Sequence, residues 1–376
     1  MNPIPYGHQS LDEEDINAVI EVLRSEWLTG GPKIPEFEEA ICRTIGCRNA
    51  VLVNSGTSAL DISVQALDLR PGSEVITTPF TFAATSNCLL YHGLRPVYAD
   101  IESDTRNIDP DRIREKITRR TKGIVAMDYA GHPCTIAEIR DIAREHDLVL
   151  IEDACHAFGA SFDGRKIGTF ADLTVFSFHP VKPITTGEGG AVVTDNSELA
   201  SRLRLLRSHG IDRDEGRGIG IKAPWAYDMR FLGRNYRMTD LQAALGNSQL
   251  KKLHRFLARR KEIADHYNDL LADVAILETP VTRENVTHGW HLYTVLVNGL
   301  DRNRFFLDLR AQQIGVNLHY IPTYRFTYYR KHLPVDPNKF PVTEDIFQRI
   351  ITLPLYPGMT DESIERVVHA IRQASR

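Results

Sequence analysis

Seven short apolar runs between residues 50 and 195 constrain the fold more than any other feature of this 376-residue sequence. Stretches with helical periodicity separate most of these runs. Continuous apolar strands joined by helices are typical of a parallel sheet that is covered on both faces. We therefore predict an α/β fold with a large, mostly parallel, seven-stranded sheet flanked by helices. The runs span residues 50–53, 74–78, 95–100, 123–128, 148–153, 174–178 and 191–195.

Several of these strands end in a polar residue, namely Asp100, Asp128, Asp153 or Ser177. In open α/β sheets, ligands bind in the crevice outside the carboxyl ends of the strands. We therefore expect the functional site to be built from these strand ends.

The sequence on either side of these runs indicates a second domain. Residues 10–27 carry the apolar stripe of a helix, which Ser10 can cap. The helical stretch at 239–274 is expected to bridge two domains, and the apolar run 290–297 is expected to form a strand. We predict a large domain at residues 1–250, including the N-terminal helical segment, and a smaller C-terminal α+β domain at residues 251–376.

Composition argues against several classes of protein. The net charge is −4 with both signs interspersed, so nothing indicates a nucleic-acid partner. The apolar runs are too short to span a bilayer, and the N-terminus lacks an export signal. The five cysteines form no pattern typical of a zinc site or of a disulfide framework. We expect a cytoplasmic protein with no metal site and no membrane partner.

The segment FSFHPVKPITTGEGG, residues 176–190, places Lys182 between an apolar strand and a glycine-rich loop. A lysine at strand ends beside another cationic group has a lowered pKa, which favours a Schiff base with a carbonyl compound. The glycines let the backbone approach a planar ligand, and Ser177 can hydrogen-bond a phosphate. The alternative is a surface lysine in a turn, which is the usual environment of lysine.

Two earlier segments add polar groups to the same predicted edge of the sheet. The stretch VNSGTSAL, residues 53–60, is either an anion site at a helix N-terminus or ordinary helix capping. Asp153 ends the most apolar strand, where a carboxylate needs a cation or several donors. It either pairs with a core arginine, caps the next helix, or holds the protonated ring nitrogen of pyridoxal phosphate. His156 lies one helical turn further on and by itself indicates little.

The order of these motifs resembles that of the DegT/DnrJ/EryC1/StrS sugar aminotransferases, which are pyridoxal-phosphate enzymes of fold type I. The resemblance runs nearly from end to end, and it implies this transferase fold with pyridoxal 5′-phosphate as the cofactor. The motifs that carry it are YGHQSLDEEDI, WLTGGPKIPEFE, NSGTSAL, TTPFTFAATSN, EDACHAFGA, FSFHPVKPITTGEGGAVVTD, LRSHGI, LGRNYRMTDLQAALGNSQL, WHLY and HYIPTY.

The resemblance implies roles for residues around the cofactor ring. Lys182 is implied to bind the cofactor as a Schiff base and to shuttle protons, and Asp153 to pair with the ring nitrogen. His156 is implied to lie near the phenolic oxygen. Phe82 is implied to stack on the ring, although packing in the core is equally compatible with its sequence context.

The resemblance also implies that the cofactor phosphate contacts two subunits. Thr57, Ser58 and Ser177 match the phosphate-binding positions, and Asn235 matches an asparagine donated by the neighbouring subunit. We therefore expect a homodimer whose active sites are shared across the interface.

The motifs FSFHPVKPITTGEGG and HYIPTYRFTYY are most similar to a subgroup in the pseudaminic-acid pathway. The implied reaction moves an amino group from L-glutamate to the C4 keto carbon of a UDP-linked 4-keto-6-deoxy sugar, forming UDP-4-amino-4,6-dideoxy-N-acetyl-β-L-altrosamine. The alternatives are another nucleotide keto-sugar, of the GDP-perosamine, UDP-bacillosamine or dTDP-sugar type, or a sugar dehydratase. Dehydratases of this family replace the lysine with histidine, so Lys182 favours amino transfer.

Lysine and arginine side chains are mostly exposed whatever their role, so exposure does not distinguish substrate contacts. The segment LTGG, residues 28–31, also departs from the usual Thr-Gln-Gly, which leaves the sugar open. The expected contacts are Tyr6, Thr29, Lys33, Arg237, His319 and Tyr320, with Arg207, His209, Arg234, Tyr324 and Arg325 as further candidates.

Overall fold

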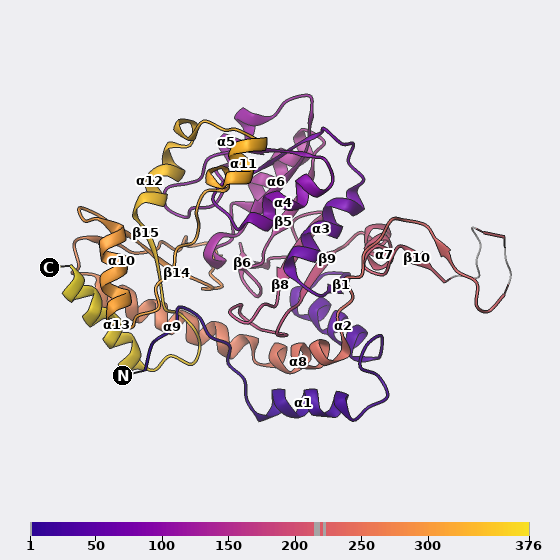
Figure 1. The fold of residues 1–376 in the computed structure, drawn as a ribbon, viewed down its shortest axis with the longest axis horizontal. Coiled ribbons are helices and arrows are strands. Elements are labelled where there is room, and N and C mark those ends of the chain that lie inside the picture. Colours follow the sequence, from indigo (N-terminus) through magenta and orange to yellow (C-terminus); the bar gives the residue numbers. More distant parts are fainter. Residues whose placement is uncertain (1, 214–218, 221–222, 376) are drawn as a thin grey trace.

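The computed structural model describes residues 2–213, 219–220 and 223–375. Its centre is a seven-stranded sheet, as predicted (Figure 1). The strand β9 runs antiparallel to both of its neighbours, and the other strand pairs are parallel. In spatial order the strands are β1 (Asn49–Val53), β9 (Gly190–Thr194), β8 (Leu173–Ser177), β5 (Val149–Asp153), β4 (Thr121–Met127), β2 (Glu74–Thr77) and β3 (Arg95–Tyr98).

The antiparallel strand follows from the connection that precedes it. Parallel neighbours need a crossover, usually a helix, whereas an antiparallel neighbour can be reached by a direct return. The chain leaves β8 and re-enters the sheet at β9 without an intervening helix. The returning segment contains Lys182, so the lysine lies at the end of β8 where ligands are expected.

Helices cover both faces of the sheet, because alternate residues of its strands are apolar on each side. In β1, Leu52 packs into one core cluster, and Val51 and Val53 pack into another. The first cluster includes residues of α2 (Lys33–Ile45), α5 (Pro110–Lys116), α6 (Ile136–Glu145) and α8 (Asp240–Lys251). The second includes residues of α3 (Gly56–Leu67), α4 (Ala83–Tyr91) and α7 (Ser197–Leu206).

The N-terminal helix α1 (Glu13–Leu23) begins two residues later than the capping prediction implies. Asp12, not Ser10, is the N-cap. Its carboxylate accepts hydrogen bonds from the backbone amides of Glu14 and Asp15, and the Asp12 amide donates a hydrogen bond to the Asp15 carboxylate. The negative charge of the Asp12 cap also interacts favourably with the helix dipole, and an uncharged serine hydroxyl lacks this interaction. The Ser10 carbonyl instead accepts a hydrogen bond from Gln249.

The predicted helical stretch at 239–274 is two helices, α8 and α9 (Leu253–Leu271), which meet at Lys252. Beyond them a three-stranded antiparallel sheet has its own core. Its strands are β12 (Leu277–Glu278), β14 (Tyr293–Val297) and β15 (Ile350–Leu353), and its helices include α10 (Arg302–Ala311), α12 (Pro341–Arg349) and α13 (Asp361–Ala374). The domain boundary at residues 250/251 stays a prediction.

Smaller elements complete the chain. Two-residue strands form the sheet β13 (Val286–Thr287), β6 (Ser161–Phe162) and β7 (Arg165–Lys166), and the pair β10 (Ile211–Asp212) with β11 (Asp228–Met229). The arm that carries β10 projects away from the body (Figure 1). Short helices are α11 (Thr327–His332) and the 3-10 turns Tyr129–Gly131, Thr323–Arg325 and Pro337–Lys339. Among the described helices, none is both long and apolar enough to cross a membrane.

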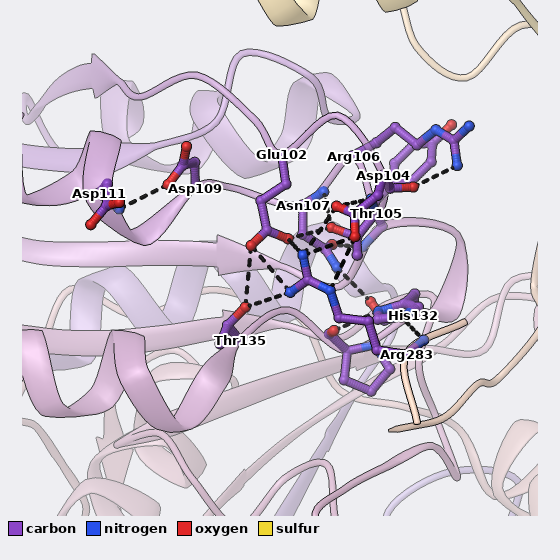
Figure 2. Close-up of polar contacts among 12 residues, drawn as sticks. Glu102, Asp104, Thr105, Arg106, Asn107, Asp109, Asp111, His132, Thr135 and Arg283 are labelled. Atoms are coloured by element: carbon purple, nitrogen blue, oxygen red, sulfur yellow. Dashed lines mark hydrogen bonds and ion pairs between the residues drawn. The ribbon is translucent and has the colours of Figure 1, made fainter. Parts of the chain in front are cut away.

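Polar contacts connect the C-terminal part of the chain to loops of the large sheet. The Arg283 guanidinium binds both Glu102 and Asp104, and its Nη1 lies 3.2 Å from the Thr135 hydroxyl (Figure 2). The Asp100 carboxylate accepts hydrogen bonds from the Val342 and Thr343 amides at the start of α12. These contacts fix the two parts against each other beside the strand ends.

Candidate active site

A cavity of about 600 Å³ opens at the carboxyl ends of the strands, in the place that the sheet topology predicts. It brings together residues from the N-terminus to position 326. Nine of the predicted site residues line it: Tyr6, Thr57, Phe82, Asp153, His156, Ser177, Lys182, His319 and Tyr320.

Only two of the four polar strand ends reach the cavity, which corrects the expectation from the sequence. Asp153 and Ser177 line it. Asp100 is occupied by the amides of α12, and Asp128 accepts the Cys134 amide at 2.8 Å. Both of these aspartates are buried, and both accept hydrogen bonds from backbone amides. Buried polar groups are normally paired in this way, so their role is structural.

Lys182 is held by a tight turn and faces the cavity. Its backbone amide donates to the His179 carbonyl at 2.9 Å, and its Nζ lies 3.4 Å from His291 Nε2. Burial lowers the pKa of the amine to about 8, against the opposing attraction of Cys155 and Asp153. A substantial fraction of the amine is therefore neutral near physiological pH, which a nucleophile or proton carrier requires.

Asp153 is 3% exposed, and the groups that donate hydrogen bonds to it within the described residues are neutral. The Thr85 hydroxyl donates to Oδ2 at 2.7 Å, and the Cys155 amide donates to Oδ1 at 3.3 Å. A carboxyl group that is oriented by neutral donors beside a cavity is placed to pair with a cationic ligand group. In the part of the chain that the structure describes, no arginine pairs with Asp153, and the arrangement fits the protonated ring nitrogen of a bound cofactor.

The N-terminus of α3 forms a cup beside Ser177. The Ser55 side chain caps the helix by accepting the Ser58 amide at 3.0 Å, and the Ser58 hydroxyl donates to Asn54 at 2.6 Å. Gly56 is required here, because a Cβ would lie 2.9 Å from the Ser177 Cβ. Thr57 is exposed to the cavity, whereas Ser58 is buried beneath it. The structure thus shows helix capping by Ser55, and the same turn leaves Thr57 exposed where an anion site at a helix N-terminus was predicted.

His156, which is buried, and Tyr320, which is half-buried, form a pair on the cavity wall. The Tyr320 hydroxyl lies 2.9 Å from His156 Nε2. Burial holds the pKa of His156 well below its usual value, and burial also raises the pKa of Tyr320 far above its usual value. Both rings are thus uncharged, and His156 Nδ1 is buried without a partner among the described residues. Such an atom fits an oxygen of a bound ligand.

Phe82 is 58% exposed, and its ring centroid lies 6.1 Å from that of Tyr320. Packing in the core, which the sequence left open for this ring, is therefore wrong. An exposed aromatic side chain at a cavity is available to cover a planar ligand.

The other predicted substrate residues lie outside the cavity of the single chain. Lys33 pairs with Glu36, Arg207 with Glu38, and Arg325 with Glu344. Arg234 Nε lies 3.4 Å from Asp61, and the Tyr324 hydroxyl donates to Glu344 at 2.6 Å. Thr29, His209, Asn235 and Arg237 are exposed.

Sequence reasoning assigned no role to two residues that shape the site, His291 and Thr85. His291 contacts Lys182 across 109 positions of sequence, and Thr85 contacts Asp153 across 68. Both belong to quoted motifs, WHLY and TTPFTFAATSN, but no spacing rule connects them with their partners. Only the tertiary fold shows these contacts.

Comparison with known proteins identifies the family. The DegT/DnrJ/EryC1/StrS aminotransferase family matches residues 9–372. The chain is 42% identical over 336 residues to the UDP-4-amino-4,6-dideoxy-N-acetyl-beta-L-altrosamine transaminase of Campylobacter jejuni, covering 88% of this chain and 87% of that one.

Solved structures agree with this match. Helicobacter pylori PseC, an aminotransferase of pseudaminic-acid biosynthesis, superimposes with a TM-score of 0.93 at 34% identity over 99% of both chains. The PLP form of the Streptococcus pneumoniae protein Spr1654 gives 0.91 at 31% identity, covering 99% of this chain and 98% of that one. The lysine, the aspartate and the α3 cup fit pyridoxal 5′-phosphate. The chain belongs to the DegT/DnrJ/EryC1/StrS aminotransferase family and is a sugar aminotransferase that depends on this cofactor.

Proposed function

We propose that the protein moves an amino group from L-glutamate to the C4 keto carbon of a UDP-linked 4-keto-6-deoxy-2-acetamido sugar. The product is UDP-4-amino-4,6-dideoxy-N-acetyl-β-L-altrosamine. The similarity to the Campylobacter jejuni transaminase and to Helicobacter pylori PseC supports this choice of sugar. The observation that carries amino transfer is a half-buried lysine with a pKa of about 8 in the same cavity as an oriented aspartate.

The cofactor, when bound, supplies an electron sink for a carbanion next to the transferred nitrogen. Asp153 would hold the ring nitrogen protonated, and His156 would contact the phenolic oxygen. The hydroxyls of Thr57 and Ser177, together with the first amides of α3, would hold the phosphate. Phe82 would cover the ring from the open side.

Lys182 performs the proton transfers in this proposal. Its neutral amine takes a proton from Cα of the amino donor in the first half-reaction. The resulting ammonium group would pass this proton to the bound cofactor, and in the second half-reaction the amine would take it back and deliver it to C4 of the sugar. General acid–base catalysis of this kind contributes roughly 10²–10⁴-fold to a rate.

The sugar binds against the apolar part of the cavity wall in this proposal. Ile321 and Phe326 line the cavity together with Phe82, and all three are exposed. An apolar wall suits the methyl group of a 6-deoxy sugar, because it offers no partner to a 6-hydroxyl. Tyr6, His319 and Tyr320 supply polar atoms beside it.

A homodimer is part of the proposal, because the cavity of one chain is poor in positive charge. Among the described residues that line it, Lys182 is the sole lysine and no arginine occurs. The substrate and cofactor carry phosphates, so further cationic or amide donors must come from elsewhere. Exposed apolar side chains offer a surface for a second copy: Leu11, Ile16, Leu23, Trp27 and Leu28 near α1, and Trp225, Tyr227, Met229 and Leu232 near β11.

Subunit mixing tests the shared site. We expect Lys182→Ala and Asn235→Asp each to be inactive as homodimers. Mixed after unfolding and refolding, they should recover about a quarter of the wild-type activity, because half of the dimers are mixed and each contains one intact site. No recovery would mean that Asn235 does not act on the partner's site.

A substrate panel tests the reaction. Purified enzyme is incubated with L-glutamate and one of several UDP-, GDP- or dTDP-linked keto-sugars, and the products are read by mass spectrometry. We expect amination of the UDP-linked 4-keto-6-deoxy-2-acetamido sugar, with Lys182→Ala as the inactive control. Preference for a GDP- or dTDP-sugar would contradict the proposed substrate but leave amino transfer intact.

A further inference from the structure

The cavity contains a side-chain contact that the proposed mechanism does not use. Lys182 Nζ lies 3.4 Å from Nε2 of His291, which is 5% exposed. His291 precedes β14 in the C-terminal part of the chain, whereas Lys182 lies between β8 and β9 of the large sheet. The fold therefore brings a second functional group to the lysine from a distant segment.

The backbone around His291 is fixed by close contacts. Its amide donates to the Ala130 carbonyl at 2.9 Å, and the Gly289 amide donates to the Gly131 carbonyl at 2.7 Å. Gly131 has φ +95°, and a Cβ there would lie 3.0 Å from the His291 nitrogen. Trp290 adopts φ 45°, which is rare for a bulky residue and persists only where the surroundings impose it.

The same segment is also held further upstream. The Arg283 amide donates to His132 Nε2 at 3.3 Å, and the Arg283 guanidinium binds Glu102 and Asp104 (Figure 2). Three residues later, β13 pairs with β6, which follows strand β5 of the seven-stranded sheet along the chain. The segment from 283 to 291 is thus attached at several points, which leaves His291 little freedom to move away from Lys182.

Arg260 of α9 holds the backbone on both sides of the contact. The residue is 1% exposed, and its Nη1 donates to the carbonyls of Trp290 at 3.1 Å and His291 at 3.4 Å. Nη2 donates to the carbonyl of Val181, next to Lys182, at 3.4 Å. One side chain therefore fixes the separation between the lysine loop and the histidine segment.

The chemistry of the contact requires a neutral imidazole. Burial, together with Lys182, His156 and Arg260 nearby, holds the pKa of His291 well below its usual value. A neutral ring has one acceptor nitrogen, which is Nε2 when Nδ1 carries the proton. A primary amine has two N–H bonds and one lone pair, so donation of one N–H to Nε2 restricts the direction of the lone pair.

We propose that His291 is a positioning residue for Lys182: its Nε2 accepts a hydrogen bond from the amine and directs the amine lone pair into the cavity. This inference rests on the proposed role of Lys182. The donor atom and the acceptor atom both belong to this chain, so the contact exists before any ligand binds.

Trapping of the amine in the cofactor-free protein tests the contact. The protein is exposed to pyridoxal phosphate at a series of pH values and reduced with borohydride, and the modified Lys182 peptide is quantified by mass spectrometry. His291→Met removes the acceptor, His291→Gln places an amide oxygen near it, and His288→Met is the matched control. His288 is buried in the same segment and stacks on Trp290.

We expect His291→Met to lower the limiting trapping rate at high pH about tenfold and to move the midpoint of the pH profile down by about one pH unit, because the acceptor stabilises the ammonium form more than the amine. His291→Gln should restore most of the rate, and His288→Met should keep the wild-type midpoint. The other groups near the amine are unchanged in every variant: Asp153, Cys155, His156, His179, Arg260 and His319.

The outcomes separate this inference from the proposed function. If wild-type protein is not trapped at Lys182, the proposed role of the lysine is wrong. If wild-type protein is trapped but His291→Met has the same rate and midpoint, or His291→Gln is no better than His291→Met, only the inference is overturned. Nitrogen-15 NMR of the wild-type protein adds a test without a core substitution: a protonated Nε2 on His291 at neutral pH would also overturn it.

Discussion

Replacing Lys182 with methionine should make the cofactor-free protein more stable, by an amount that depends on pH. The folded protein holds the lysine pKa at about 8, against a usual value of 10.5, chiefly through burial. Below pH 8 the amine is charged in both the folded and the unfolded protein, and the full free-energy cost of desolvating it opposes folding. Between pH 8 and 10.5 this penalty decreases as the unfolded lysine alone remains charged, and above 10.5 it disappears.

The shift from 10.5 to about 8 sets the size of the effect. At 1.36 kcal/mol per pKa unit, the penalty at pH 7 is about 3 kcal/mol, as an upper estimate because water in the cavity solvates the amine. At pH 9.5 it falls to about 1 kcal/mol. The advantage of Lys182→Met over wild type should therefore shrink by about 2 kcal/mol over this range.

Urea unfolding of both cofactor-free proteins, at equal protomer concentration and at several pH values from 7 to 9.5, measures this difference. Methionine also adds apolar burial, but that contribution does not vary with pH, so the slope is the informative quantity. A stability difference that stays constant across the range would show that the lysine titrates normally in the fold, and the reasoning about its reactivity would fail with it.

Two further substitutions test the supports of the site. Thr85→Val removes the hydroxyl that donates to Asp153 at 2.7 Å. Thr85→Val should weaken cofactor affinity about tenfold in equilibrium dialysis, whereas Thr85→Ser should bind the cofactor as the wild type does. Equal binding by the wild type and both variants would show that the hydroxyl does not orient Asp153. Asp61→Asn weakens a buried carboxylate that accepts from His92 at 2.7 Å, and we expect a loss of about 2 kcal/mol in urea unfolding. Asp68→Asn, at the exposed C-cap of the same helix, should change stability by less than about 0.5 kcal/mol, and a similar loss in both variants would contradict the assignment.

The sheet and the position of the lysine could be predicted from the sequence because both depend on local patterns. Continuous apolar runs specify buried strands, and a strand end specifies one edge of the sheet. Asp153, Ser177 and Lys182 follow such runs directly, and all three line the cavity. The cap of α1 was less predictable, since Ser10 and Asp12 are both good capping residues and only the helix start decides between them.

Contacts between distant segments could not be predicted in the same way. Asp100 and Asp128 follow strands as Asp153 does, yet a helix of the C-terminal part and a loop amide occupy them instead. Which strand-end carboxylate stays free depends on where other elements dock. The contact between His291 and Lys182 has the same origin, because neither spacing nor periodicity relates positions 109 residues apart.

The basic residues show why substrate recognition was the hardest part to predict. A side chain can bind a diphosphate only if its charge is not already neutralised, and sequence alone does not show this. Lys33, Arg207 and Arg325 each pair with a glutamate, so binding an anion would first break an ion pair. Arg237 is exposed and lies two residues from Asn235. Arg237 therefore stays a candidate for binding a diphosphate, and Asn235→Asp in the mixing experiment examines the loop that carries it.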